Sequence, residues 1–122
     1  MTQEDKDLLL RDLCARLPYG VKGVEANTLC SLNTVTRFKS IVKNIEYKIE
    51  HLGFKPYLFP LSSMTEEQSM EFALLQVNTH KDGFLYVCDC ANMMKWLLKN
   101  HFDIYGLIEK GLAIDASGLN IY

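Results

Sequence analysis

The sequence predicts an α+β protein of one domain spanning residues 1–122. We expect an N-terminal helix, a small antiparallel sheet or partial barrel, two further helices and a C-terminal tail that wraps the domain. Three observations predict this order. Apolar residues recur at helical spacing near the N-terminus and again after residue 65, β-branched residues dominate from 21 to 51, and a proline-containing apolar segment separates these regions.

Residues 3–17 have the pattern of an amphipathic helix. Thr2 is a suitable N-cap, and Pro18 is expected to end the helix. The apolar face comprises Leu9, Leu10, Leu13, Cys14 and Leu17. The polar face, expected toward solvent, comprises Asp5, Lys6, Arg11, Asp12 and Arg16. This pattern predicts a helix that docks through one side.

Short strands are predicted between Val21 and His51. The clearest alternation is over 45–49, where isoleucines and Tyr47 face one way and charged residues the other. Further candidate strands are 21–25, 28–35 and 38–42, and 54–61 is expected to close the sheet. Gly23 and Gly53 are expected at a bulge or sharp bend.

Residues 55–68 are interpreted as a packed crossing between the sheet and the later helices. Pro56 and Pro60 lack backbone donors, so we expect no central strand through them. Their neighbours are too apolar for a solvated linker. Ser62, Ser63 and Thr65, followed by acidic residues, predict the start of the second helix.

The second helix is predicted over 66–77 and the third from an Asp89 cap to about Asn100. The second is expected to bury Met70, Ala73, Leu74 and Val77, with Phe72 or Leu75 broadening the stripe. The third is expected to bury Cys90, Met93, Met94, Leu97 and Leu98. Trp96 falls off that stripe and is therefore a candidate protein-contact residue. Glycines at 106, 111 and 118 predict turns in the wrapping tail.

Composition gives general limits on function. The net charge of −2 is divided unevenly, with +3 over residues 21–60 and −4 over 61–122. No apolar run approaches the roughly 18 residues of a membrane span, and the acidic N-terminus does not resemble a signal peptide. We therefore expect a cytoplasmic protein without a membrane partner, its four cysteines reduced.

Three blocks of the chain carry a family resemblance: DLCARLPYGVK at 12–22, KPYLFPLSSMTEE at 55–67 and HFDIYGLIEKGLAIDASGLNIY at 101–122. They resemble a family of small uncharacterised proteins from gut bacteria and their phages or mobile elements. The resemblance covers roughly 40% of the chain, including both ends, and implies one complete member. It implies a bacterial or phage setting and supplies no catalytic residue or ligand.

Candidate catalytic and metal sites are weak. Cys88 and Cys90, with His80 and His101 nearby in sequence, lack the ligand spacing of a zinc site. Glu66 and Glu67 are explained by capping of a helix N-terminus. We therefore predict no metal, no cofactor and no catalytic residues, although a small enzyme whose site is not readable from sequence stays an alternative.

The sequence is compatible with two binding functions. The first is a non-enzymatic accessory or protein-interaction module of bacterial or mobile-element origin, with an exposed apolar patch near Trp96 or the tail. The alternative is a nucleic-acid-binding small barrel using the basic segment 37–55, with contacts from Arg37, Lys39, Lys43 and Lys48. Acidic residues on the same predicted face as Lys48 weaken that alternative.

Overall fold

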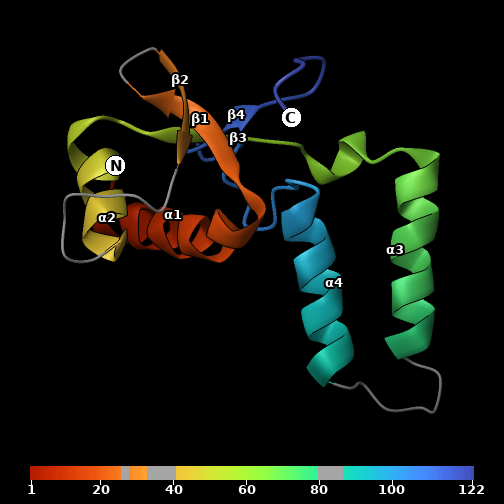
Figure 1. The fold of residues 1–122 in the computed structure, drawn as a ribbon. Helices are drawn as coiled ribbons and strands as arrows, with labels where there is room; N and C mark the ends of the chain where they lie inside the picture. Colours follow the sequence, from red (N-terminus) through yellow and green to blue (C-terminus); the bar gives the residue numbers. More distant parts are fainter. Residues whose placement is uncertain (26–27, 33–40, 80–86) are drawn as a thin grey trace.

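The computed structural model describes residues 1–25, 28–32, 41–79 and 87–122. The α+β fold has two parts, shown in Figure 1. The body contains helix α1 (Gln3–Arg16), helix α2 (Ile41–His51), a small sheet and the C-terminal tail. The hairpin consists of α3 (Glu66–Thr79) and α4 (Val87–Lys99), which lie side by side and project from the body (Figure 1).

The sheet is mixed rather than antiparallel as predicted. Its described strands are β1 (Val21–Glu25), β2 (Thr28–Leu32), β3 (Lys55–Leu58) and β4 (Ile114–Asp115), in the order β2-β1-β3-β4. β1 is antiparallel to β2 and β3, whereas β4, contributed by the tail, is parallel to β3. A parallel neighbour requires a long crossover, and here residues 59–113 supply it.

The strand predicted over 45–49 is wrong, because these residues lie within α2. Ile45 and Ile49 are buried, but their separation of four residues suits a helix face as well as a strand face. Tyr47 distinguishes the helical period from the strand period. A strand would turn it inward with the isoleucines, but it is 40% exposed. The start of α2 also overrides the candidate strand at 41–42, while 33–40 lie outside the described residues.

The prediction that Pro56 excludes a central strand is also wrong, since β3 lies between β1 and β4. The Leu58 carbonyl accepts from the Ala116 amide at 2.8 Å, so it faces the β4 side. Backbone groups two residues apart in a strand point the same way, which directs the Pro56 nitrogen to that side too. β3 pairs with β4 only from Tyr57 onward, so the missing donor interrupts no ladder bond.

Gly23 does not form the predicted bulge, because the β1–β2 register is continuous from Val21 to Glu25. A Cβ at this position would lie 2.5 Å from the Phe54 ring and from the Lys55 carbonyl oxygen. The glycine therefore admits the buried Phe54 ring against the strand. Gly53, with φ +62°, makes the predicted bend after α2.

Helix α1 is confirmed, including its cap. The Thr2 side chain accepts from the Asp5 amide at 3.1 Å, and Asp5 accepts in return from the Thr2 amide, which forms a capping box. The α-helix ends at Arg16, and Pro18 lies in a following 3-10 turn over Leu17–Tyr19.

The interior of the body is formed by two helices and the sheet. Leu9 and Leu13 of α1 are fully buried. They belong to one apolar core with Val21, Ile45, Ile49, Phe54, Leu58, Leu107, Leu112 and Ala113. The tail thus contributes to the core as well as to the sheet.

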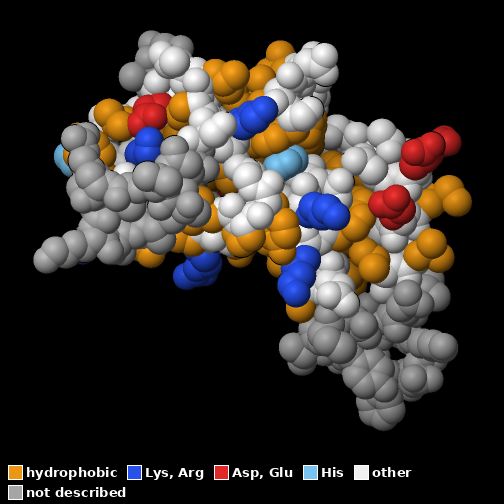
Figure 2. Space-filling model, in the orientation of Figure 1, with side chains coloured by type: hydrophobic (Ala, Val, Ile, Leu, Met, Phe, Trp, Pro, Cys, Tyr) orange, Lys and Arg blue, Asp and Glu red, His pale blue; other side chains and the backbone are white. Residues whose placement is uncertain are grey.

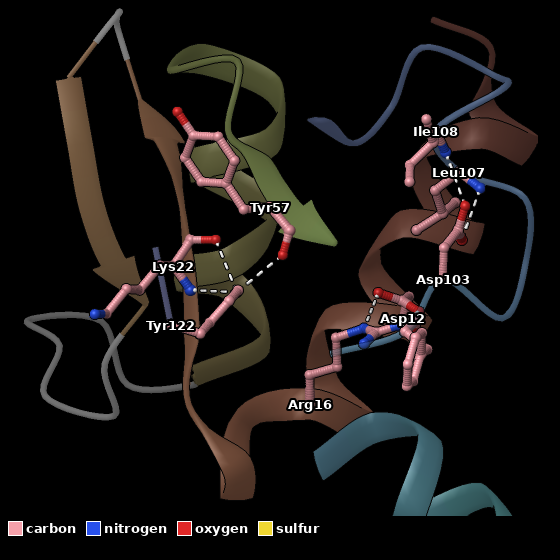
Figure 3. Close-up of polar contacts among 9 residues, drawn as sticks. Asp12, Arg16, Lys22, Tyr57, Asp103, Leu107, Ile108 and Tyr122 are labelled. Atoms are coloured by element: carbon pink, nitrogen blue, oxygen red, sulfur yellow. Dashed lines mark hydrogen bonds and ion pairs between the residues drawn. The ribbon is translucent and has the colours of Figure 1, made fainter. Parts of the chain in front are cut away.

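Asp12 and Arg16 were expected on the solvent side of α1, and this prediction is wrong. Both side chains are fully buried, and Arg16 donates to the Asp12 carboxylate at 2.7 and 3.0 Å. Arg16 also donates to the Phe102 carbonyl in the tail. The tail covers this side of α1, so Arg16 Nε and Nη2 bond to Asp12 and to a tail carbonyl, whereas Arg16 Nη1 is buried without a hydrogen-bond partner (Figure 3).

The predicted helix starts are correct for α3 and shifted for α4. The Gln68 amide donates to Thr65 Oγ1 at 3.1 Å, and the Thr65 amide donates to Gln68 Oε1 at 2.9 Å, again a capping box. Ser62 and Ser63 belong to a 3-10 turn before it, Leu61–Ser63. Helix α4 begins at Val87, so Asp89 lies inside its first turn and is not the cap.

Candidate functional site

Helix α3 has apolar residues on two opposite sides. Its inner side faces α4 with the half-buried residues Gln68, Phe72 and Leu75. The opposite side carries Met70, Ala73 and Leu74, called the outer stripe below. Met70 is 68% exposed and Leu74 is 64% exposed. The outer stripe was predicted to be core, and this is wrong: Phe72 and Leu75, predicted only to broaden that stripe, lie on the more buried side of the helix.

Two acidic residues share the side of the outer stripe. Glu66 and Glu67 are exposed in the first turn of α3, three to four residues before Met70. Figure 2 shows acidic side chains at this end of the helix and hydrophobic side chains along its outer edge. Their charge is favoured at a helix N-terminus, and it gives the outer stripe one acidic end.

Helix α4 buries part of its predicted stripe. Met93 and Leu97 are half-buried and Leu98 is buried, as predicted, whereas Met94 is 42% exposed and that part of the prediction is wrong. Lys95 and Lys99 are exposed near the C-terminal end of the helix. The side chain of Cys90 lies outside the described residues.

Trp96 lies at the junction of the hairpin with the body. Its ring packs on Phe72 of α3, with centroids 5.5 Å apart, and stacks on Phe102 of the tail at 5.8 Å. Its Nε1 donates to Glu71 at 3.1 Å. The half-buried Trp96 side chain thus joins both helices of the hairpin to the tail.

Aromatic contacts continue from Trp96 into the sheet. Phe102 meets Phe59 edge to face at 6.4 Å, and Phe59 lies 6.1 Å from the Tyr122 ring. Tyr122 in turn stacks on His101 at 3.5 Å. His101 and Phe102 donate to carbonyls of the last turn of α4, in the pattern of a Schellman motif. His101 adopts φ +64°, a conformation in which glycine is usual at this position of the motif.

The Tyr122 hydroxyl takes the place of a backbone pairing between β1 and β3 (Figure 3). β1 and β3 pair at Gly23–Pro56 and Val24–Lys55, and Lys22 would face Tyr57 at the next position. Instead, the hydroxyl accepts from the Lys22 amide at 3.0 Å and donates toward the Tyr57 carbonyl at 2.9 Å. The tail is thereby fastened between two strands, which confirms that it wraps the domain.

Polar groups beside this junction are arranged for packing. Both Asp103 carboxylate oxygens accept backbone amides, from Leu107 at 2.9 Å and Ile108 at 3.0 Å (Figure 3). Burial raises the pKa of Asp12, and the Arg16 guanidinium opposes that rise. Burial, with Arg16 and Lys22 nearby, lowers the pKa of His101 to about 4. A histidine that stays neutral near pH 7 beside aromatic rings is suited to packing rather than to proton transfer.

Of the four predicted nucleic-acid contacts, the structure describes Lys43 and Lys48. Arg37 and Lys39 lie outside the described residues. Lys43 is exposed on α2, whereas Lys48 donates to both Glu25 oxygens at 2.9 and 3.1 Å. Five residues of helix rotate these two lysines about 140° apart, and one of them is already paired.

The described thiols are not activated. Cys14 and Cys30 are free and half-buried. Burial and the neighbouring Glu25 raise the pKa of Cys30 to about 11, and burial also raises that of Cys14, with Glu46 adding to the rise. Both thiols therefore stay protonated near neutral pH, which disfavours nucleophilic or ligand roles. The side chains of His80, Cys88 and Cys90 lie outside the described residues.

Within the described ranges, no three His, Cys, Asp or Glu side chains are grouped to hold a metal ion. A search of the same residues finds no helix with the length and hydropathy needed to cross a bilayer.

Two surface clefts lie among the described residues. One of about 210 Å³ lies between α1 and α2 and is lined by Gln3, Lys6, Asp7, Leu10, Glu46, Ile49 and Glu50. Another of about 340 Å³ lies beside Leu61, Ile104 and Ile108. Its Asp103 already accepts two backbone amides. Ser62 and Glu109 also line the second cleft, but among the described residues no hydrogen bond joins this hydroxyl to a carboxylate, so the outer stripe is the stronger candidate site.

Comparisons of the chain with protein-family models, with curated proteins and with solved structures found no match.

Proposed function

We propose that this protein is a non-enzymatic interaction module of bacterial or mobile-element origin that docks another protein on the outer stripe of α3. The observation that carries the proposal is the exposure of Met70 and Leu74, at 68% and 64%, on adjacent turns of a projecting hairpin. Single exposed apolar residues are ordinary, but here they share one helix face.

The energetic argument follows from area. Full burial of a Met or Leu side chain contributes roughly 1.5–3 kcal/mol, and these two residues retain most of that surface in water. A partner that covered them would gain this contribution without first unfolding or reorganising the hairpin. The inner side of α3 is already held by Phe72 and Trp96, which keeps the outer stripe pre-positioned.

A photocrosslinking comparison in bacterial extract tests the proposal. A benzophenone amino acid replaces Ala73 in the protein and in a Met70→Gln/Leu74→Gln variant. Leu29→Gln supplies the matched control, because Leu29 is 55% exposed on β2, away from α3. We expect defined adducts that the double variant loses and the control keeps. Adducts that persist in the double variant, or none at all, would contradict docking on this face.

The nucleic-acid alternative has less support because Lys48 is paired with Glu25. It predicts salt-dependent retention on a DNA column that Lys43→Gln weakens, and absence of retention at low salt would remove it. The enzyme alternative lacks a described pocket in which catalytic groups converge.

A further inference from the structure

We propose that the occupant of the outer stripe is an amphipathic helix of another protein, which runs antiparallel to α3 and carries Lys or Arg in its last turns. This inference rests on the proposed function and specifies the chemistry of the partner. It draws on the acidic end of the stripe, the direction of α3 and the way in which α4 already packs.

The carboxylates at the N-terminus of α3 indicate where the partner helix carries its basic residues. The side of α3 that carries Met70 and Leu74 begins with Glu66 and Glu67, both exposed. A partner covering the two apolar residues reaches these carboxylates one turn further toward the α3 N-terminus. Eight residues separate Glu66 from Leu74, about 12 Å along a helix. Three turns of a partner helix therefore suffice to contact both the apolar and the acidic parts.

Helix dipoles give the direction. The N-terminus of α3 carries partial positive charge, which favours the C-terminal end of a neighbouring helix beside it. Lysines and arginines are themselves favoured in the last turn of a helix. An antiparallel partner satisfies both preferences and places its basic residues against Glu66 and Glu67, whereas a parallel partner would place its own N-terminus there.

Helix α4 supplies an example of this arrangement within the chain. It runs antiparallel to α3 on the inner side, and Lys99 lies in its last turn with Lys95 one turn earlier (Figure 1). The Trp96–Phe72 contact places the C-terminal half of α4 beside the middle of α3. The proposed partner would repeat this geometry on the opposite side, so that α3 becomes the middle helix of three.

A second copy of α3 is a poorer occupant. The sequence of α3, EEQSMEFALLQVNT, contains neither lysine nor arginine. Two copies packed through their outer stripes would therefore leave Glu66 and Glu67 without a basic residue on the facing helix. A basic helix removes that deficiency, and the methionine in the stripe adapts readily to a partner's side chains.

Three stapled helical peptides of four turns, each with the same leucine stripe, test the inference by fluorescence anisotropy. The first carries lysines in its last two turns, the second carries the same lysines in its first two turns, and the third carries glutamates in its last two turns. The protein variants are Met70→Gln/Leu74→Gln and Glu66→Gln/Glu67→Gln. Leu29→Gln and Glu4→Gln are matched controls at an exposed apolar and an exposed acidic position.

We expect the lysine-last peptide to bind roughly tenfold more tightly than the glutamate-last peptide, as two or three exposed charge pairs would give. The Glu66→Gln/Glu67→Gln variant should lose most of this preference, and Met70→Gln/Leu74→Gln should weaken the lysine-last peptide at least as much. Both controls should leave affinities unchanged. Carbodiimide coupling should join Glu66 or Glu67 to lysines of the lysine-last peptide and not of the lysine-first peptide.

Equal affinity for the lysine-last and glutamate-last peptides would overturn the inference, as would equal coupling of the lysine-first peptide. A dimer in sedimentation that Met70→Gln/Leu74→Gln dissociates would also overturn it, because a second copy would then occupy the stripe. The proposed function is judged separately by stripe-dependent adducts in extract. If those adducts form while the peptide preference fails, docking stands and only the partner's chemistry is wrong.

Discussion

Helices α1 and α3 are each fourteen residues long and begin with a capping box, yet they keep their apolar residues in opposite environments. Leu9 and Leu13 of α1 are completely buried, whereas Met70 and Leu74 of α3 are largely exposed. The difference lies in the neighbours: α1 is covered by α2, the sheet and the tail, while the main neighbour of α3 among the described elements is α4. Identical local patterns can therefore serve stability in one region and leave a surface free in another.

The body and the hairpin also differ in the exposure of their charged side chains. The body encloses the Asp12–Arg16 pair without solvent contact, so both charges depend on each other. The acidic residues in the first turn of α3 stay in water and are free to meet a partner. If this contrast is correct, substitutions in the body should change folding, and substitutions on the outer stripe should change binding alone.

The largest effect is expected for Asp12→Ala. This variant leaves Arg16 buried without its counter-charge, which should lower the free energy of unfolding by about 3–5 kcal/mol. Chemical denaturation monitored by circular dichroism measures the loss. The double variant Asp12→Leu/Arg16→Met removes both charges and should recover much of it. A loss below about 1 kcal/mol in Asp12→Ala would show that the pair is not sealed from water.

Trp96→Ala should loosen the hairpin from the body. Removing this ring abolishes contacts with both Phe72 and Phe102, at a cost of about 2–4 kcal/mol. Hydrogen exchange followed by mass spectrometry should show faster exchange in α3 and α4 with little change in α1. Equal acceleration in all three helices would indicate that the hairpin and the body unfold as one unit.

Acid should destabilise the body through His101. Burial lowers its pKa to about 4 from the ordinary value of 6.5, so the unfolded chain binds the proton first. The contribution of neutral His101 to the free energy of unfolding is complete above pH 6.5 and decreases as the pH falls toward 4. Thermal midpoints between pH 7 and 4 should therefore fall more steeply for the wild type than for His101→Gln. Parallel slopes would contradict this assignment.

Tyr122→Phe should have a smaller effect. It keeps the ring on His101 and Phe59 but removes the hydroxyl that joins Lys22 to Tyr57. We expect a loss of about 1 kcal/mol in denaturant unfolding, the usual contribution of a hydrogen bond. Tyr19→Phe is a convenient control at a half-buried tyrosine elsewhere in the body. Equal losses in the two variants would mean that the Tyr122 hydroxyl has no special role between the strands.

The smallest effect on folding is expected for Met70→Gln/Leu74→Gln. Because both side chains lie in water, the free energy of unfolding should stay within about 0.5 kcal/mol of the wild-type value. Leu9→Ala, in the core of the body, is expected to lose about 2–5 kcal/mol. Differential scanning calorimetry of this variant and of Met70→Gln/Leu74→Gln compares the two regions directly. A comparable loss in both would place the outer stripe in the core after all.

Features governed by nearby residues were predictable from the sequence. The caps of α1 and α3 each join residues three positions apart, and the turn glycines of the tail all adopt positive φ. Such features depend on local geometry, so Thr2, Thr65 and Gly106 could be interpreted without knowing what packs nearby. The α+β class follows from the same local signals.

The remaining features depended on tertiary neighbours. The spacing of Ile45 and Ile49 suits either a strand or a helix. A strand would bury Tyr47 with them, whereas the helix leaves it exposed. Coverage by the tail, not the pattern of α1, turned Asp12 and Arg16 into a buried pair. On α3, the predicted stripe of Met70, Ala73 and Leu74 is exposed, and the packing of α4 covers the side of Phe72 instead. Helical and strand periods specify which residues share a side, whereas only long-range contacts decide which side meets water.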